Sequence, residues 1–89
     1  MGQCILYQVI NHTSQELFFG MTELPLDKEI ERLAKDPKAP CAHWKKGDIV
    51  QWRPLTEQME ERFVRTLHRD VETRTPPNNF RVIKTFGAA

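Results

Sequence analysis

The chain has 89 residues, which is enough for one domain, and residues 1–89 are treated as a single domain. Hydrophobic residues make up 39% and charged residues 28%, a balance that is typical of a folded globular protein and excludes a disordered chain. The formal net charge of +1 comes from 13 basic and 12 acidic residues, so no overall charge draws the chain toward nucleic acid or an anionic membrane.

The lengths of the apolar runs and the two cysteines indicate where in the cell the protein is expected to lie. No stretch approaches the roughly 18 apolar residues that a membrane-spanning helix needs, so no membrane partner is expected. Cys4 and Cys41 follow no recognisable signal peptide and are most simply free thiols in a reducing compartment. The sequence therefore predicts a cytoplasmic protein.

The first third of the chain has the pattern of a β-hairpin. Residues 4–10 are rich in β-branched and aromatic side chains, which favour a strand, and alternation places Tyr7 and Val9 on the same face. Residues 11–14 form a polar cluster that is typical of a turn. Residues 17–21 are a second apolar run of strand length, so the two runs predict an antiparallel pair.

A helix is predicted directly after Pro25. Asp27, Glu29 and Glu31 favour its N-terminal half, where the helix dipole is positive. Pro37 ends the helix and leads into an irregular loop over residues 36–47. Four apolar residues have the spacing of one helix face and form an apolar stripe: Leu26, Ile30, Leu33 and Ala34.

The second half of the chain predicts a strand, a helix and a final extended segment. Residues 49–52 read as the strand, and Thr56 as the N-cap of a helix from about 57 to 72. The apolar stripe of that helix is Met59, Phe63, Leu67 and Val71, and the final segment holds Phe80, Val82 and Phe86. The fold class is α+β, with a small, mainly antiparallel sheet flanked by helices in the order β-β-α-β-α-β.

Two short motifs on the predicted hairpin resemble those of a known nuclease family. Ile5-Leu6-Tyr7 and Phe18-Phe19-Gly20 are similar to the Gly-Ile-Tyr and Tyr-Ile-Gly for which the GIY-YIG superfamily is named. Thr22 continues the second motif as in many members, and Asn78-Asn79-Phe80 resembles the closing asparagine of the family. The order of elements agrees over nearly the whole chain, so the resemblance implies a GIY-YIG-like fold.

The resemblance also implies a phenol near the attacking water, and here the chain departs from the family. Tyr7 retains the first tyrosine, whereas Phe18 replaces the second, and Ile5 replaces the first glycine. A phenylalanine can neither donate nor accept a proton, so one of the two phenols is lost.

The family further uses an arginine on the first helix and a glutamate on the second that holds one divalent metal. Lys28 occupies the spacing of that arginine, and Arg32 lies one helical turn later. Glu60 best matches the glutamate, with Glu61 as the alternative. Mg²⁺ suits a site with a single carboxylate because it keeps most of its waters. Lysine supplies a charge but not the bidentate fork that matches phosphate.

A basic run on the second helix suggests a separate binding surface. Arg62, Arg65 and Arg69 are spaced by three and four residues and therefore share a side of the helix. With Lys45 and Lys46 from the loop they form a candidate phosphate-binding surface. The alternative is an ordinary solvated helix face, paired with its acidic neighbours.

These features together predict a diverged GIY-YIG-like domain that binds DNA or another nucleic acid, with weak or no cleavage. The remnant catalytic site would consist of Tyr7, Lys28, Arg32 and Glu60. Two alternatives stay open: a non-catalytic protein-interaction module that keeps only the fold, and an active metal-dependent endonuclease.

Overall fold

A computed structural model of the chain describes residues 2–74, 76 and 79–83. The expected α+β class is confirmed, with the order β-β-α-β-β-α-β, one strand more than predicted. Asn78 and Phe86, to which the sequence assigned a family motif and a final segment, lie outside the described residues. The elements are β1 (Gln3–Asn11), β2 (Glu16–Thr22), α1 (Leu26–Ala34), β3 (Val50–Pro54), β4 (Met59–Glu60), α2 (Glu61–Glu72) and β5 (Arg81–Val82).

The five strands form one mixed, mostly antiparallel sheet around β1. The strand order is β3-β1-β2-β5, and β4 pairs with the start of β1. Only β5 runs parallel to its neighbour β2 within the described residues. The predicted hairpin is confirmed, and its register sets Tyr7 opposite Gly20 and Val9 opposite Phe18.

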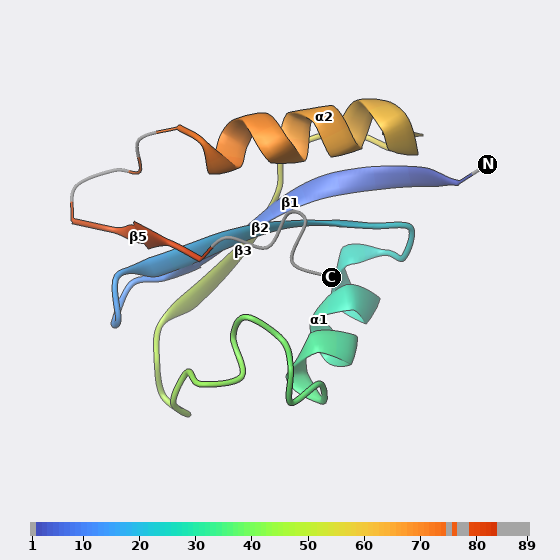
Figure 1. Cartoon of the computed structure of the whole chain (residues 1–89). Coiled ribbons are helices and arrows are strands. Elements are labelled where there is room, and N and C mark those ends of the chain that lie inside the picture. Colours follow the sequence, from blue (N-terminus) through green and yellow to red (C-terminus); the bar gives the residue numbers. More distant parts are fainter. Residues whose placement is uncertain (1, 75, 77–78, 84–89) are drawn as a thin grey trace.

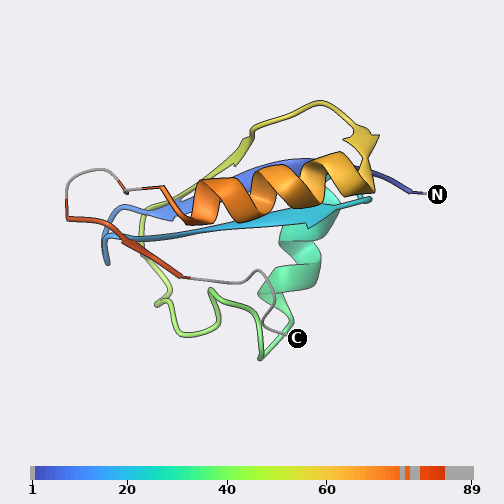
Figure 2. The same cartoon turned by 45° about the horizontal axis from the view of Figure 1, so that its top comes forward.

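Each face of the sheet carries its own hydrophobic core. Helix α2 covers one face, while α1 and the irregular segment that follows it lie on the other (Figures 1 and 2). Leu6, Leu17 and Val64 belong to the core under α2, and Tyr7 and Phe18 belong to the core on the α1 side. Neither helix of the described part has the length and apolar character needed to cross a membrane.

Helix α2 begins four residues later than the sequence predicts. Met59 and Glu60 pair with Cys4 and Gln3 as the short strand β4, so the helix starts only at Glu61. The assignment of Thr56 as its N-cap is wrong, because the Thr56 hydroxyl instead accepts a hydrogen bond from the Leu6 backbone N–H at 3.0 Å. The polar residue before the helix therefore ties the 55–58 connection to β1.

The predicted apolar stripes are each wrong at one position. In α2 the fully buried side chain is Val64, whereas Phe63 is 49% exposed. In α1 the buried side chains are Glu29 and Leu33, and Ala34 is exposed. Successive helical residues differ in direction by about 100°, so an inward-facing Val64 turns its neighbour Phe63 toward the helix flank.

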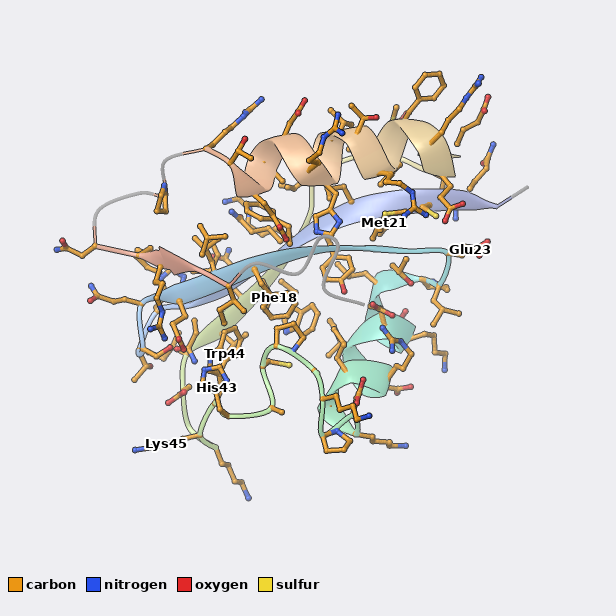
Figure 3. All side chains as sticks on the ribbon, viewed as in Figure 1. Phe18, Met21, Glu23, His43, Trp44 and Lys45 are labelled. Atoms are coloured by element: carbon orange, nitrogen blue, oxygen red, sulfur yellow. The ribbon has the colours of Figure 1, made fainter. Side chains whose placement is uncertain are left out.

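A buried carboxylate at the start of β2 joins three parts of the α1-side layer. Glu16 accepts hydrogen bonds from His43 Nε2 at 2.9 Å and Trp44 Nε1 at 2.8 Å, and it also pairs with Arg81 of β5. Burial alone would raise the pKa of Glu16, but these hydrogen bonds outweigh it and lower the pKa to about 2. Figure 3 shows His43 and Trp44 together below the sheet, beside Phe18.

Gly20 is needed because of the ring that lies over it. Tyr7 sits directly opposite on β1, and a Cβ built on Gly20 would meet Tyr7 Cζ at 2.5 Å as well as the hydroxyl. The Tyr7 ring is buried and also contacts Trp52, with ring centroids 5.9 Å apart, so it has little room to move away. The glycine of the second motif therefore allows the tyrosine of the first to cross β2.

The replacement Gly20→Ala is expected to lower the free energy of unfolding by roughly 1–3 kcal/mol, as overpacking of a well-filled core does. Denaturant unfolding measures the loss. In a Tyr7→Leu background the para carbon and the hydroxyl are gone, so the same Gly20→Ala change should cost clearly less. An equal cost in both backgrounds would show that the Tyr7 ring is not the cause.

Candidate functional site

The Tyr7 side chain reaches across β2 to helix α1. Its hydroxyl donates a hydrogen bond to Glu29 Oε2 at 2.7 Å. Tyr7 is 3% exposed, and it is the only tyrosine of the chain. The phenol that the family resemblance singles out is therefore a buried hydrogen-bond donor.

The acceptor, Glu29, collects four donors on its two carboxylate oxygens. Thr22 donates from its hydroxyl at 3.2 Å, and Arg32 donates from Nε and Nη2, both at 2.9 Å. Glu29 is only 1% exposed, and burial by itself would raise the pKa of the carboxyl. The hydrogen bonds from Arg32, Tyr7 and Thr22 outweigh that effect and lower the pKa, so Glu29 carries its charge in the folded protein.

This arrangement keeps the Tyr7 phenol protonated. Burial first, and then the hydrogen bond to the charged Glu29, raise the pKa of Tyr7 far above its ordinary value. A tyrosine acts as a general base only as the phenolate, which can accept a proton from water. With its raised pKa, Tyr7 forms the phenolate only at very high pH. The Tyr7 hydroxyl also already donates its proton to the Glu29 carboxylate.

The structure separates the two candidates for the family's arginine. Arg32 contacts the partner of Tyr7 directly, as the bidentate donor to Glu29. Lys28 points elsewhere and forms an exposed pair with Glu31 at 3.8 Å. Of the two, Arg32 is thus the residue that the fold brings to Tyr7.

The two candidate glutamates are also separated. An open cavity of about 700 Å³ beside the end of β2 is lined by Glu29 and Arg32 from α1 and by Glu61 and Arg65 from α2. Glu60 lines a neighbouring depression with Gly2, Gln3, Glu61 and Arg62, and not the larger cavity. Among the described residues, Tyr7 lines neither of the two. The alternative glutamate, Glu61, is therefore the one that shares a cavity with Arg32.

Each candidate metal-binding carboxylate of this region already pairs with an arginine. Glu60 pairs with Arg62 at 3.1 Å and Glu61 with Arg65 at 2.8 Å, so a cation would compete with an arginine at either one. The described residues contain no group of three or more His, Cys, Asp or Glu side chains placed to hold one ion, but a single-carboxylate site does not need such a group. The Mg²⁺ site implied by the resemblance therefore stays a prediction.

Phe18, which replaces the second tyrosine of the family, is a core residue. It is 1% exposed and packs against Trp44 and Trp52, with ring centroids 5.7 and 6.5 Å away. Its position next to Trp44 is visible in Figure 3. The side chain at this place serves packing between the sheet and the 35–49 segment.

The two halves of the predicted basic surface lie on opposite sides of the sheet. Arg62, Arg65 and Arg69 are exposed on α2. Lys45 and Lys46 belong to the segment on the α1 side, where Figure 3 shows Lys45 on the far side of the sheet from α2. One flat ligand face therefore cannot contact both groups at once.

The sequence reasoning missed Glu29, the residue around which this site is organised. The sequence assigns Glu29 to the favourable charge at the helix start and to ordinary pairing with the basic residues of the same helix, and the Arg32–Glu29 pair confirms the second assignment. A usable signal was present, because Glu29 follows Leu26 by three residues and precedes Leu33 by four, which places it on the inward face. A charge on an apolar helix face needs a partner, and Tyr7 and Arg32 are that partner set.

Comparison of the chain with protein-family models, with curated proteins and with solved structures finds no significant match. The GIY-YIG resemblance thus rests on the motifs and on the order of the elements.

The single tyrosine permits a direct test of the Tyr7–Glu29 contact. Because the pKa of Tyr7 is raised, the ultraviolet phenolate signal of the folded protein should appear only well above pH 10, the ordinary midpoint. The Tyr7–Glu29 hydrogen bond therefore stabilises the fold below pH 10, and this contribution to stability is lost as the pH rises through the raised pKa of Tyr7.

In Glu29→Gln the charged acceptor is gone, so the midpoint should move down toward 10, although burial keeps part of the shift. Tyr7→Phe gives the blank, since it leaves no phenol in the chain. A wild-type midpoint near 10 in protein that circular dichroism shows to be folded would contradict the buried hydrogen bond.

Proposed function

We propose that this chain is a diverged GIY-YIG-like domain that binds nucleic acid through the outer side of α2 and does not hydrolyse it. The contact surface is the arginine row, defined as Arg62, Arg65 and Arg69. The proposal rests on how firmly carboxylates hold the polar groups of the two candidate sites. Tyr7 and Arg32 donate to the buried carboxylate of Glu29, although the Arg32 side chain is itself 53% exposed. In the described part of the chain, Arg62 and Arg65 pair only with exposed carboxylates.

The ion pairs of the arginine row are of the kind that a phosphate can replace. The side chains of Arg62 and Arg65 are 76% and 56% exposed, and their partners Glu60 and Glu61 are exposed as well. Such surface pairs contribute only about 0–1 kcal/mol each. Arg69 has no ion-pair partner among residues 2–74, 76 and 79–83. All three guanidinium groups are therefore able to meet a phosphate backbone.

A phosphate replaces the carboxylate partner of Arg32 less easily than the partners of the arginine row. Its partner Glu29 is buried, and removing a charged partner from such a group leaves the carboxylate without compensation. Exchange of Glu29 for a phosphate at Arg32 is correspondingly costly. Binding without cleavage follows from this, since the side chains nearest the only phenol are already satisfied by one another.

The spacing of the arginine row suits a phosphate backbone. Residues 62 and 69 are separated by roughly 10 Å along the axis of α2, at about 1.5 Å per residue. One strand of nucleic acid offers a phosphate about every 3.4 Å along a duplex axis, so the row spans roughly three of them. Guanidinium groups also match phosphate oxygens in a bidentate manner.

A reducing compartment agrees with this proposal. Cys4 and Cys41 are both free thiols in the folded chain. Stable disulfides belong mainly to secreted proteins, so two unpaired cysteines support the cytoplasm as the location, where nucleic acid is available.

Binding of a labelled oligonucleotide, followed by fluorescence anisotropy at about 50 and 200 mM salt, tests the arginine row. The double replacement Arg65→Gln/Arg69→Gln should weaken binding and reduce the salt slope by about 1.8, at roughly 0.9 for each lost duplex contact. The matched control Lys45→Gln/Lys46→Gln removes the same charge on the other side of the sheet and should bind as the wild type does.

Two results would contradict this assignment. Absence of binding even at low salt would favour the protein-interaction module that keeps only the fold. Weakening by the lysine control alone would move the contact surface to the α1 side.

Cleavage is tested separately with supercoiled plasmid and Mg²⁺. The wild-type protein and Tyr7→Phe should both leave the plasmid intact, because the Tyr7 phenol cannot take up a proton in the folded state. Nicking by the wild type that disappears in Tyr7→Phe would overturn the non-hydrolytic proposal and favour the active endonuclease. Nicking that survives in both proteins would point to a contaminating enzyme.

A further inference from the structure

Phe63 is the aromatic residue among the four exposed large apolar side chains of the described chain. It is 49% exposed on α2 and belongs to neither hydrophobic core, whereas Val64, Leu67 and Val71 of the same helix pack against the sheet. Helix α2 already has its inward contacts without Phe63. Packing within the described chain therefore does not explain a phenylalanine at this position.

The exposed ring has one specific neighbour, which is a cation. The guanidinium carbon of Arg62 lies 4.9 Å from the centroid of the Phe63 ring, within the range of a cation–π contact. Arg62 is itself 76% exposed and pairs on its other side with the exposed Glu60. The pair therefore presents an aromatic surface and a delocalised planar cation together to solvent.

We propose that Phe63 and Arg62 form a stacking platform for an unpaired nucleobase, so that the preferred ligand of this chain is single-stranded nucleic acid. This inference rests on the proposed function, in which the arginine row holds the backbone, and it gives Arg62 the further role of supporting the stacked base. An aromatic ring next to a guanidinium plane provides stacking and cation–π contact to any base. A base inside a duplex has both faces covered by its neighbours and cannot use such a platform.

The geometry of the helix supports a strand that crosses α2 obliquely. Phe63 projects about 100° around the helix from Arg62, about 120° from Arg69 and about 160° from Arg65. The ring thus lies on the flank of α2 opposite Arg65, near the N-terminal end of the arginine row. A single strand that meets Arg69 on the outer side of α2 and then passes around the helix would bring a base to Phe63, the exposed aromatic residue on that flank.

The test compares Phe63→Ala, Phe63→Trp and the wild type on three labelled ligands of equal length: oligothymidine, oligouridine and a DNA duplex. Phe63→Ala should bind the preferred single strand about 5- to 150-fold more weakly, the usual loss for one stacked base. Its affinity for duplex should stay unchanged. Phe63→Trp keeps a ring and should retain single-strand affinity. The two single-stranded arms show whether DNA or RNA is the better ligand.

Controls separate loss of stacking from loss of fold. Phe63→Leu keeps apolar volume without a ring and should behave like Phe63→Ala, and circular dichroism checks that both are folded. Ile49→Ala removes another exposed apolar side chain, 66% exposed at the edge of β3, and should leave binding unchanged.

The outcomes distinguish this inference from the proposed function. If Phe63→Ala binds single strands as the wild type does, or loses the same factor on duplex, the platform is wrong while the arginine row stands. If the wild type binds none of the three ligands, both ideas fail. If only Ile49→Ala weakens binding, the base contact lies elsewhere and the platform is overturned.

Discussion

The buried carboxylate of Glu29 is the interaction on which the arrangement of this domain depends. A charge removed from water must be compensated, and here the donors come from three elements: Tyr7 of β1, Thr22 of β2 and Arg32 of α1 itself. Satisfying them together fixes how α1 lies against the hairpin. Gly20 is part of the same constraint, because only a residue without a Cβ lets the Tyr7 ring cross β2. A helix of nine residues is thereby held by polar contacts as much as by its apolar face.

Glu16 plays a comparable part at the opposite end of β2. It binds His43 and Trp44 of the irregular segment and Arg81 of β5, and so holds that segment, which has little regular hydrogen bonding of its own, against the sheet. The two acids lie at the two ends of the layer that contains α1. The α2 side combines an apolar core of Val64 and residues of β1 and β2 with a buried polar pair within the helix, His68 Nε2 and Glu72 Oε2 at 3.0 Å.

The same contact that stabilises the fold decides what the remnant site can do. Burial and the hydrogen bond to Glu29 raise the pKa of Tyr7, and the Arg32 guanidinium binds the same buried carboxylate through Nε and Nη2. In the proposed nuclease-derived domain, structural stability and phosphodiester chemistry would compete for Tyr7 and Arg32. On the other side of the sheet, α2 carries the exposed ion pairs Arg62–Glu60 and Arg65–Glu61 and the exposed Phe63 ring, which Arg62 contacts. The binding proposals therefore place the ligand on α2.

The sequence alone determined the α+β class, the hairpin and the existence and type of both helices, because alternation and helical spacing report which side chains face inward. It also identified Tyr7, Arg32 and the α2 arginines as residues of interest. Tertiary contacts decided the rest. The pairing of Met59–Glu60 with β1 moved the start of α2, and the orientation of that helix buried Val64 in place of Phe63. Glu29 became the centre of the site only because β1, β2 and α1 meet there, and no local pattern records which distant donors will compensate a buried charge.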